Sequence, residues 1–416
     1  METEEIYIYN DISKSVPKNV VRVVVKDLKE IGDSAFAYCK SLEEITFPDN
    51  LEEIGDGAFV SCSSLAKIKL PDNLKKIGRA AFRYCTSLND IKFPDNLEEI
   101  GDGAFVSCSS LAKIKLPDDL EEIGASAFQF CTSLKIIKLP DNLKKIGAST
   151  FDSCSSLEEI TLPYNLSVIG ASAFAYCISL KEITLPKALS VIGDKAFASC
   201  SSLEGIALPD NLSVIGASAF QFCTSLNNIT FPKALSVIGD SAFGSCYSIV
   251  DITFPKDLKK IGDSAFRFCE NLKEITFPYN LEEIGDRAFA SCKSLVGISN
   301  GFSPTSCNVS AFSGSFKLEE AAKTAGFDTP IEWGNDLWNK RSNADVRHAV
   351  VGSVIQDNIR EDGGHVAETE GEKFIRLLGN VPGTGTNKTN EKGEVLRHIL
   401  GFVGPNRGGG TRNRGG

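Results

Sequence analysis

Histidine, long apolar runs and spaced sets of metal ligands are scarce in this sequence. Its three histidines, His348, His365 and His398, have no cysteine or carboxylate set at metal-ligand spacing beside them, which argues against a zinc site or an acid–base centre. No stretch approaches the roughly 18 apolar residues of a membrane span. The acidic start, METEEIYIYN, lacks the basic and apolar regions of a secretory signal. We therefore predict a cytoplasmic protein with no metal, no cofactor and no membrane span.

A surplus of basic residues is also missing. The 416 residues carry a net charge of -10, which argues against a duplex nucleic-acid binder, because phosphate binding needs a basic surface. A composition of 42% hydrophobic and 24% charged residues is nevertheless that of a folded chain.

One motif, IGxxAFxxC, is abundant and recurs at a constant step of 23 residues. A fixed step of this length is typical of a solenoid, in which each unit buries its apolar face against its neighbours. Such folds usually present a surface and enclose no catalytic pocket. The twelve copies begin at Ile31, Ile54, Ile77, Ile100, Ile123, Ile146, Ile169, Ile192, Ile215, Ile238, Ile261 and Ile284.

One repeat, residues 42–64, predicts the local structure of all of them. Its first residues, LEEITFP, alternate like a short strand that Pro48 ends. A second short strand is expected around Ile54. Gly55 is expected to permit a sharp corner or a positive φ. The residues GAFVSC then predict a short helical turn with Asp56 as its cap.

The thirteen cysteines do not suggest a disulfide framework. Twelve of them, from Cys39 to Cys292, occupy the same repeat position, so that their side chains stack in parallel about 4.8 Å apart. Parallel side chains neither form disulfides nor converge on a metal. We predict a buried column of reduced thiols, which suits a reducing compartment.

The residue before each of these cysteines alternates between aromatic and serine. This alternation gives a longer period of 46 residues, and it would relieve crowding if the turn side of the solenoid is tightly curved. The series runs Tyr38, Ser61, Tyr84, Ser107, Phe130, Ser153, Tyr176, Ser199, Phe222, Ser245, Phe268, Ser291.

The combination of LxxIxLP with NLxxIGxxAFxxCxSL resembles the BspA-like, or type 5, leucine-rich repeat over about residues 28–300. This resemblance implies a right-handed leucine-rich-repeat solenoid with a parallel β-sheet on its concave face and short helical turns on the other. It also implies adhesion or protein binding and no enzymatic activity. One departure is that the asparagine ladder of other leucine-rich repeats is incomplete, since Asp119 and Ala188 replace two of its members.

The residues on either side of the repeat isoleucine are expected to face solvent. In the early repeats they form two columns rich in lysine, opposed only by Asp90, whereas the later repeats are acidic and rich in threonine. Stacked lysines repel by up to about 1 kcal/mol per neighbour in water. Either an acidic partner binds these columns, or duplication has copied a neutral surface position. The lysines are Lys67, Lys69, Lys92, Lys113, Lys115 and Lys138.

A second candidate surface follows from four adjacent repeats that carry Ser-Val where the others carry charged pairs. If these valines are exposed they form an apolar strip for a partner, and the alternative is that they tuck under the sheet edge. They are Val168, Val191, Val214 and Val237.

The ends of the chain depart from the repeat. Residues 1–27 are predicted to form an N-terminal cap of strands, before the repeats at 28–300, and residues 301–330 a C-terminal cap that contains the helix KLEEAAKTAG. Residues 331–403 predict a small α-helical appendix. Its PGTGTNKT segment is not a phosphate loop, because Pro382 and Asn387 stand where that motif requires glycine. Residues 404–416 form a Gly/Arg-rich flexible tail.

These observations favour a non-catalytic scaffold that binds a protein partner, expected to be acidic, on a concave sheet with a basic N-terminal half. Two alternatives stay open. One is a cell-surface adhesin-like protein, as the resemblance permits. The other is an RNA-associated protein, because short arginine-glycine segments like the tail bind single-stranded RNA weakly.

Overall fold

The computed structural model describes residues 6–300, 307–308, 310–337 and 339–340. The chain divides into two compact units, 1–335 and 336–416. Of the second unit only residues 336, 337, 339 and 340 are described, and they are helical. Most of the predicted helical appendix, the three histidines and the Gly/Arg-rich tail therefore lie outside the described residues.

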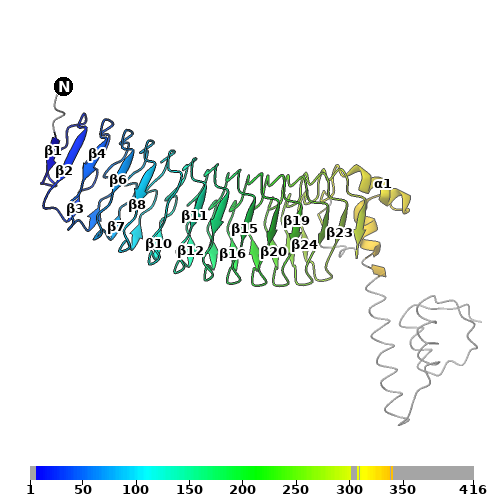
Figure 1. Cartoon of the computed structure of the whole chain (residues 1–416). Coiled ribbons are helices and arrows are strands. Elements are labelled where there is room, and N and C mark those ends of the chain that lie inside the picture. Colours follow the sequence, from blue (N-terminus) through cyan, green and yellow to red (C-terminus); the bar gives the residue numbers. More distant parts are fainter. Residues whose placement is uncertain (1–5, 301–306, 309, 338, 341–416) are drawn as a thin grey trace, which may run out of the picture. The chain divides into compact units, whose positions relative to one another are not determined.

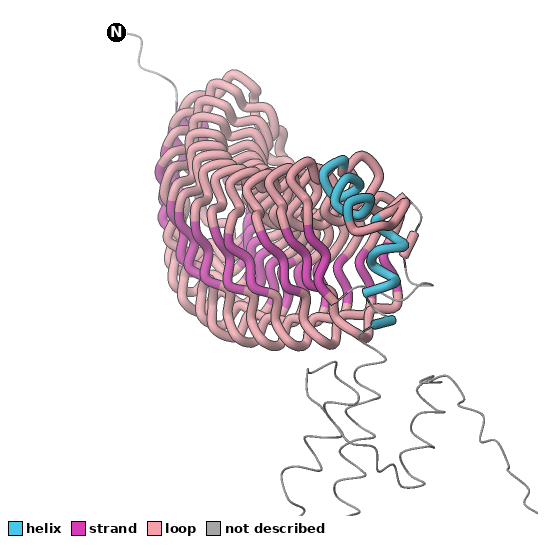
Figure 2. Tube along the Cα trace, turned by 90° about the vertical axis from the view of Figure 1, so that its right-hand side faces the viewer, coloured by secondary structure: helices cyan, strands magenta, loops and turns pink. Residues whose placement is uncertain are grey.

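The first unit is a stack of coils joined by parallel strand pairing (Figure 1), which confirms the predicted solenoid. Figure 2 shows the strands of successive coils lying next to one another, with loops and turns forming the rest of each coil. Two series of strands run along the stack. The first strand ladder comprises β1 Ile6–Tyr9, β2 Arg22–Val25, β4 Glu44–Thr46, β6 Lys67–Lys69, β8 Asp90–Lys92, β11 Ile136–Lys138, β13 Glu159–Thr161, β15 Glu182–Thr184, β17 Gly205–Ala207, β19 Asn228–Thr230, β21 Asp251–Thr253, β23 Glu274–Thr276 and β25 Gly297–Ser299.

The second strand ladder has two residues per coil, and every strand in it ends on the repeat isoleucine. It contains fewer interruptions than the first ladder, with a single break between Ile123 and Lys145. Its members are β3 Glu30–Ile31, β5 Glu53–Ile54, β7 Lys76–Ile77, β9 Glu99–Ile100, β10 Glu122–Ile123, β12 Lys145–Ile146, β14 Val168–Ile169, β16 Val191–Ile192, β18 Val214–Ile215, β20 Val237–Ile238, β22 Lys260–Ile261 and β24 Glu283–Ile284.

The core consists of columns of identical side chains. The repeat phenylalanines, from Phe36 to Phe289, are fully buried. Their rings stack in parallel, from 5.0 Å between Phe36 and Phe59 to 5.7 Å between Phe128 and Phe151. Columns of buried leucine and isoleucine surround them. Some of these rings also meet a phenylalanine of their own coil edge-on, as Phe59 meets Phe47 at 6.1 Å. Because the ring stack links each coil to the next, the stability of the unit is distributed along the stack.

The thiols form the predicted column. Twelve cysteines are free and fully buried, and no disulfide occurs within the described part of the chain. Each thiol donates a hydrogen bond to a carbonyl of the preceding coil, as Cys85 does to Phe59 over 3.1 Å. Burial raises the pKa of the Cys85 thiol to about 12. The column is therefore protonated and structural at neutral pH.

The segment predicted as a helical turn forms a run of overlapping tight turns without an α-helical stretch. Along this segment, successive backbone N–H groups donate in turn to a carbonyl of their own coil and to a carbonyl of the next coil. Ala37 donates to Ser34 over 3.0 Å, and Tyr38 donates to Val60 over 2.7 Å. This pattern requires positive φ at two positions per coil, which Ser34 and Tyr38 adopt in the first repeat. The predicted cap is replaced by contacts between coils, because the Asp56 carboxylate accepts the N–H of Arg79 over 2.6 Å.

The positive φ considered for the repeat glycine is not found. Gly55 and its equivalents do not adopt positive φ. A Cβ at Gly55 would instead lie 2.7 Å from the carbonyl oxygen of Ile31, and one at Gly124 would lie 2.4 Å from the amide nitrogen of Asp102. The glycine is required because adjacent coils approach too closely for any side chain.

The ends of the first unit close the stack. Strands β1 and β2 extend the first ladder as predicted, and Tyr9 packs edge-on against Phe36 at 4.9 Å. At the other end Phe312 continues the ring stack, and Ser315 occupies the cysteine position, where its hydroxyl donates to Phe289 over 2.8 Å. The predicted closing helix is α1 Phe316–Thr324, and Gly326 follows it with a φ of 90°.

Candidate functional site

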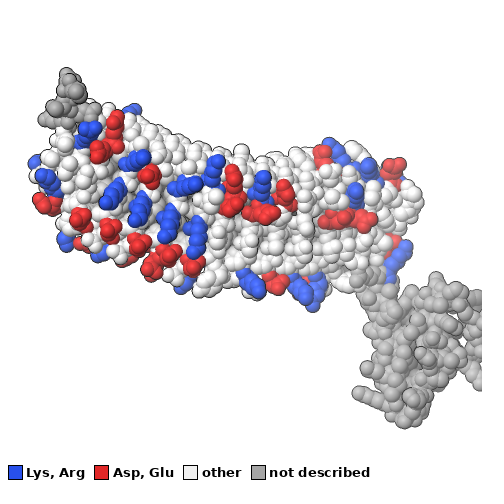
Figure 3. Space-filling model, viewed as in Figure 1, with Lys and Arg blue, Asp and Glu red and all other residues white. Residues whose placement is uncertain are grey.

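The lysine columns lie on the outer face of the first strand ladder. All six predicted lysines are exposed, while the isoleucine between each pair is buried. Strands β6 and β8 place Lys69 directly beside Lys92, and a single bridge places Lys113 beside Ile136. Figure 3 shows the resulting basic band beside a row of acidic side chains. The structure therefore confirms that these positions face solvent on one surface.

In the described part of the chain, the lysine columns lack the ion pairs that some lysines along the second ladder make, a property that they share with Lys145 of that ladder. Within the described residues, none of the six has a carboxylate within ion-pair distance. On the second ladder, Lys75 pairs with Glu52 at 3.0 Å and Lys260 with Glu283 at 3.0 Å. Like charges directly opposite each other destabilise a sheet pair, which applies to Lys69 and Lys92, whereas Lys67 lies opposite Asp90.

The valine strip is partly exposed. Val191 and Val214 have exposed fractions of 37% and 36%, and Val168 and Val237 are of intermediate burial. The four pair in register through β14, β16, β18 and β20, with Lys145 and Lys260 at the two ends. The four valines thus form a short, partly exposed apolar segment of a ladder whose other strands carry charged residues.

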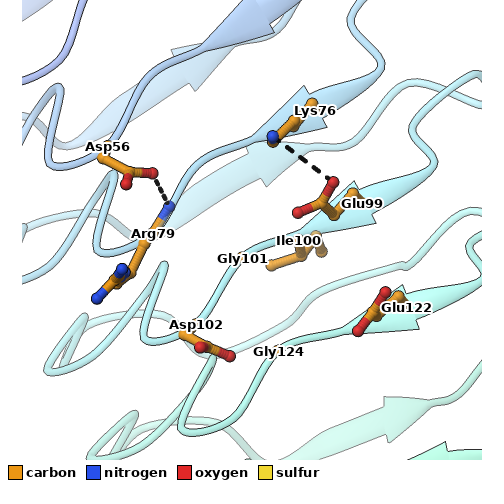
Figure 4. Close-up of a pocket in the computed structure, with 9 residues that line it drawn as sticks. All are labelled: Asp56, Lys76, Arg79, Glu99, Ile100, Gly101, Asp102, Glu122 and Gly124. Carbon is orange, nitrogen blue, oxygen red and sulfur yellow. Dashed lines mark hydrogen bonds and ion pairs between the residues drawn. The ribbon is translucent and has the colours of Figure 1, made fainter.

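A charged hollow of about 240 Å³ lies along the second ladder (Figure 4). The Asp56 carboxylate is held by the Arg79 N–H at 2.6 Å, and Lys76 approaches Glu99 to 3.8 Å. Glu99 and Glu53 together raise the pKa of Lys76. The lining carries the acidic Asp56, Glu99, Asp102 and Glu122 against the basic Lys76 and Arg79. We regard the hollow as a by-product of stacked charged residues.

A second hollow, of about 410 Å³, lies on the turn side between Phe222 and Phe268. Sequence reasoning missed two of its lining residues, Gly244 and Tyr247. The signal was present, because both depart from the residues found at the same positions of other coils. Neither hollow offers a metal site: the described residues contain no cluster of three or more metal-ligating side chains. They also contain no helix that is long and apolar enough to cross a membrane.

The comparisons with known proteins agree with this architecture. A model of the BspA type leucine rich repeat region, built on six repeat copies, matches residues 18–134, 76–204 and 190–319. The chain belongs to this family.

Solved leucine-rich repeat structures resemble this BspA type protein. A leucine-rich repeat protein of Bacteroides ovatus is 31% identical, with a TM-score of 0.57 over 68% of this chain and 79% of the other. A leucine rich cell surface protein of Faecalibacterium prausnitzii is 27% identical, with a TM-score of 0.48 over 75% and 91%. The leucine rich repeat protein of T. pallidum is 34% identical, with a TM-score of 0.39 over 42% and 83%. No curated protein matches the chain.

Membership in this family means that the repeat unit is a scaffold of the leucine-rich repeat kind. Such scaffolds generally bind proteins and are generally not catalytic.

Proposed function

We propose that this BspA type leucine rich repeat protein is a non-catalytic scaffold that binds an acidic segment of a protein partner on its lysine columns. The observation that carries the proposal is the contrast between the two ladders. On the second ladder, Lys76 and Lys260 each pair with a glutamate of an adjacent coil and Lys145 does not, whereas none of the six lysines of the first ladder has an ion pair within the described residues.

The energetics support an external counter-charge. Neighbouring lysines along the first ladder repel by up to about 1 kcal/mol in water, and an acidic ligand would convert this repulsion into attraction. Within a strand, Lys67 and Lys69 point to the same face, roughly 7 Å apart at the usual rise per residue. An acidic segment lying across the coils would therefore meet a lysine at each step of the stack.

Charge reversal tests the proposal. The variant Lys69→Glu, Lys92→Glu, Lys115→Glu, Lys138→Glu changes one column of the basic surface. The matched control reverses four exposed lysines elsewhere, Lys187, Lys195, Lys233 and Lys256, so that both variants have the same net charge. Circular dichroism establishes that both fold.

Binding is measured first with a labelled ten-residue glutamate peptide, by fluorescence anisotropy at two salt concentrations. We expect the wild type and the control to bind equally, with affinity falling as salt rises, and the column variant to lose at least tenfold. Equal binding by all three proteins would refute the lysine columns as the site. Capture from native lysate with nuclease present then identifies the partner and separates protein from RNA binding.

The valine strip is the second candidate contact surface of the same scaffold. The double variant Val191→Glu, Val214→Glu adds charge at its two most exposed residues. If the partner captured from lysate is lost from this variant but retained by the lysine variant, the strip and not the basic columns is the binding surface.

We further propose a cytoplasmic location, which the twelve buried free thiols favour because reduced cysteines are typical of reducing compartments. Antibody staining of intact and permeabilised cells tests this proposal. Staining of intact cells, or removal of the protein by protease added outside the cell, would place it on the surface and favour an adhesin-like role instead.

A further inference from the structure

The hollow between Phe222 and Phe268 interrupts a regular row of side chains on the turn side of the stack. Along the turn side, the position before each cysteine carries an aromatic ring in every second coil and serine between. An unbroken series of hydrogen bonds holds this position in register. Phe222 donates its N–H to Gly244 over 2.9 Å, and Ser245 donates to Arg267 over 2.7 Å. The rings are therefore mounted on a rigid backbone.

The rings gain little from the fold itself. Phe222 is 46% exposed and stands at a φ of 62°, a region that bulky side chains rarely adopt and that costs energy. Phe268 has the same φ of 62° and lies beneath the guanidinium of Arg267, 4.5 Å from its ring centre. The positive φ belongs to the repeat geometry, since the serines of the intervening coils adopt it too, but the exposed part of the Phe222 ring is apolar surface that the fold does not cover.

Two residues of the intervening coil open the space between these rings. The coils between the other ring pairs carry Val60, Val106, Asp152 and Ala198 where this coil carries Gly244. The backbone does not require the glycine: φ at Gly244 is not positive, and an added Cβ would meet nothing closer than the Ser241 carbonyl oxygen at 3.4 Å.

The same coil also adds a third aromatic wall. Tyr247, which is 39% exposed, stands where the coils between the other ring pairs carry Ser63, Ser109, Ser155 and Ser201. The hollow of about 410 Å³, which we call the slot, is thus lined by three aromatic rings and by Gly244, which has no side chain. Of the two departures from the repeat, one removes a side chain from the lining and the other adds an aromatic ring to it.

All the polar side chains around the slot except Glu270 can donate a hydrogen bond, although only the Arg267 guanidinium cannot also accept one. The Gln221 amide, the Tyr247 hydroxyl and the Arg267 guanidinium line it, together with serine hydroxyls. Its carboxylate is already engaged, because Glu270 pairs with Lys293 at 2.7 Å. A ligand suited to this slot therefore has flat apolar faces and supplies acceptors more than donors.

From these features we infer that the slot binds a proline-rich segment of a partner protein in the polyproline II conformation. Proline lacks an N–H, and this conformation has no internal hydrogen bonds, so its carbonyls are free to accept from the wall. Proline-rich segments are recognised in grooves lined by aromatic rings, where their stiffness limits the entropy lost on binding.

The dimensions agree with this ligand. The buried rings beside the slot, Phe220, Phe243 and Phe266, are 5.2 Å apart from coil to coil, and two such steps separate Phe222 from Phe268. One turn of polyproline II has three residues at about 3.1 Å each, or roughly 9 Å. A single turn therefore spans the interval between the two rings, with its prolines against them.

The repeat itself supplies test variants that are expected to fold. Gly244→Val introduces the residue found at this position in the coils of Val60 and Val106, and Phe268→Ser introduces the serine of every intervening coil. Tyr84→Ser removes a ring of the same row at a distant coil and is the control. The probes are fluorescein-labelled decaproline and a labelled (Pro-Pro-Leu)4 peptide, with a glycine-serine peptide of equal length as the negative control.

We expect the wild type and Tyr84→Ser to bind at least one proline probe, and Gly244→Val and Phe268→Ser to weaken it at least tenfold in an anisotropy titration. If neither proline probe binds the wild type at millimolar concentration, or if Gly244→Val binds as well as the wild type, the inference is wrong. Retention of the wild type, but not Phe268→Ser, on an insoluble β-linked glucan without proline binding would assign the slot to a polysaccharide and equally overturn it.

Discussion

The thiol of Cys62 donates a hydrogen bond to the backbone carbonyl of Phe36, 3.1 Å away in the preceding coil. The same bond recurs along the stack and ends with Cys292, which donates to Phe266. The Phe36 carbonyl also accepts the backbone N–H of Cys39 over 3.1 Å, so the thiol fills its second acceptor site and finds a hydrogen-bond partner for itself in a fully buried environment. This role explains why a small side chain that donates a hydrogen bond is retained in every repeat, and why Ser315 can replace it at the end.

The first prediction concerns reactivity. The thiolate is the reactive form of cysteine, and burial raises the pKa of the column thiols, so the native protein should resist alkylation. Treatment with iodoacetamide at pH 8, followed by intact mass spectrometry, should leave the column unmodified and label at most Cys307, which is of intermediate burial but whose pKa burial likewise raises to about 12. In urea all thirteen cysteines should react. Rapid native labelling of several column thiols would show that the stack opens easily.

The second prediction is that alkali destabilises the fold. A raised pKa means that the folded state holds protons that the unfolded state has lost, so this stability is present below the ordinary thiol pKa of 9.0 and disappears as the pH rises toward about 12. Each thiol contributes a slope of at most about 1.4 kcal/mol per pH unit. The urea midpoint should fall steeply between pH 9 and 11. A midpoint that does not change over this range would contradict the assigned protonation.

Much of the fold was predictable because the same pattern of side chains recurs in twelve repeats, and each copy supports the same structural inference. The strand around each isoleucine, the buried phenylalanine and the cysteine column follow from side-chain type and spacing. The turns and the glycine did not follow, because both depend on hydrogen bonds and contacts between coils that lie 22 to 26 residues apart in sequence. A pattern read within one repeat carries no information on how closely the next coil approaches.

For the candidate surfaces, too, some features could be predicted from the sequence and others could not. Exposure of the lysine columns followed from strand alternation. The lack of ion pairs there did not, because it depends on which carboxylates the neighbouring coils present. The slot beside Gly244 was missed because one glycine and one tyrosine in a long repeat carry little weight until the rings around them are placed.

The glycine finding gives the third prediction. Gly124→Ala places a Cβ 2.4 Å from a backbone nitrogen, so the coils must separate, at a cost of about 1–3 kcal/mol. Gly205→Ala is the control, because its Cβ would lie 3.7 Å from the nearest atom, and it should be neutral or slightly stabilising. Urea unfolding followed by circular dichroism measures both. Equal effects of the two substitutions would refute the close-approach explanation.

The fourth prediction separates stability from binding. Lys92→Glu should stabilise the protein by about 0.5–1 kcal/mol at low salt, because it replaces repulsion with Lys69 by attraction across paired strands. The gain should shrink at high salt, and Lys92→Gln should give roughly half of it. The same variant should weaken binding of the glutamate peptide. A loss of stability in Lys92→Glu would mean that the columns are not under repulsive strain.

The fifth prediction addresses cooperativity along the stack. Phe174 lies near its middle, between Phe151 at 5.5 Å and Phe197 at 5.3 Å, and truncation to alanine should cost about 3–5 kcal/mol. Because each coil contacts only its neighbours, this loss is concentrated at one interface and should let the two halves unfold separately. The urea curve should therefore broaden or show two steps. Phe36→Ala, next to the N-terminal strands, should instead fray one end and leave a single main transition. If Phe174→Ala keeps one transition with an unchanged slope, coupling between coils extends further than nearest neighbours.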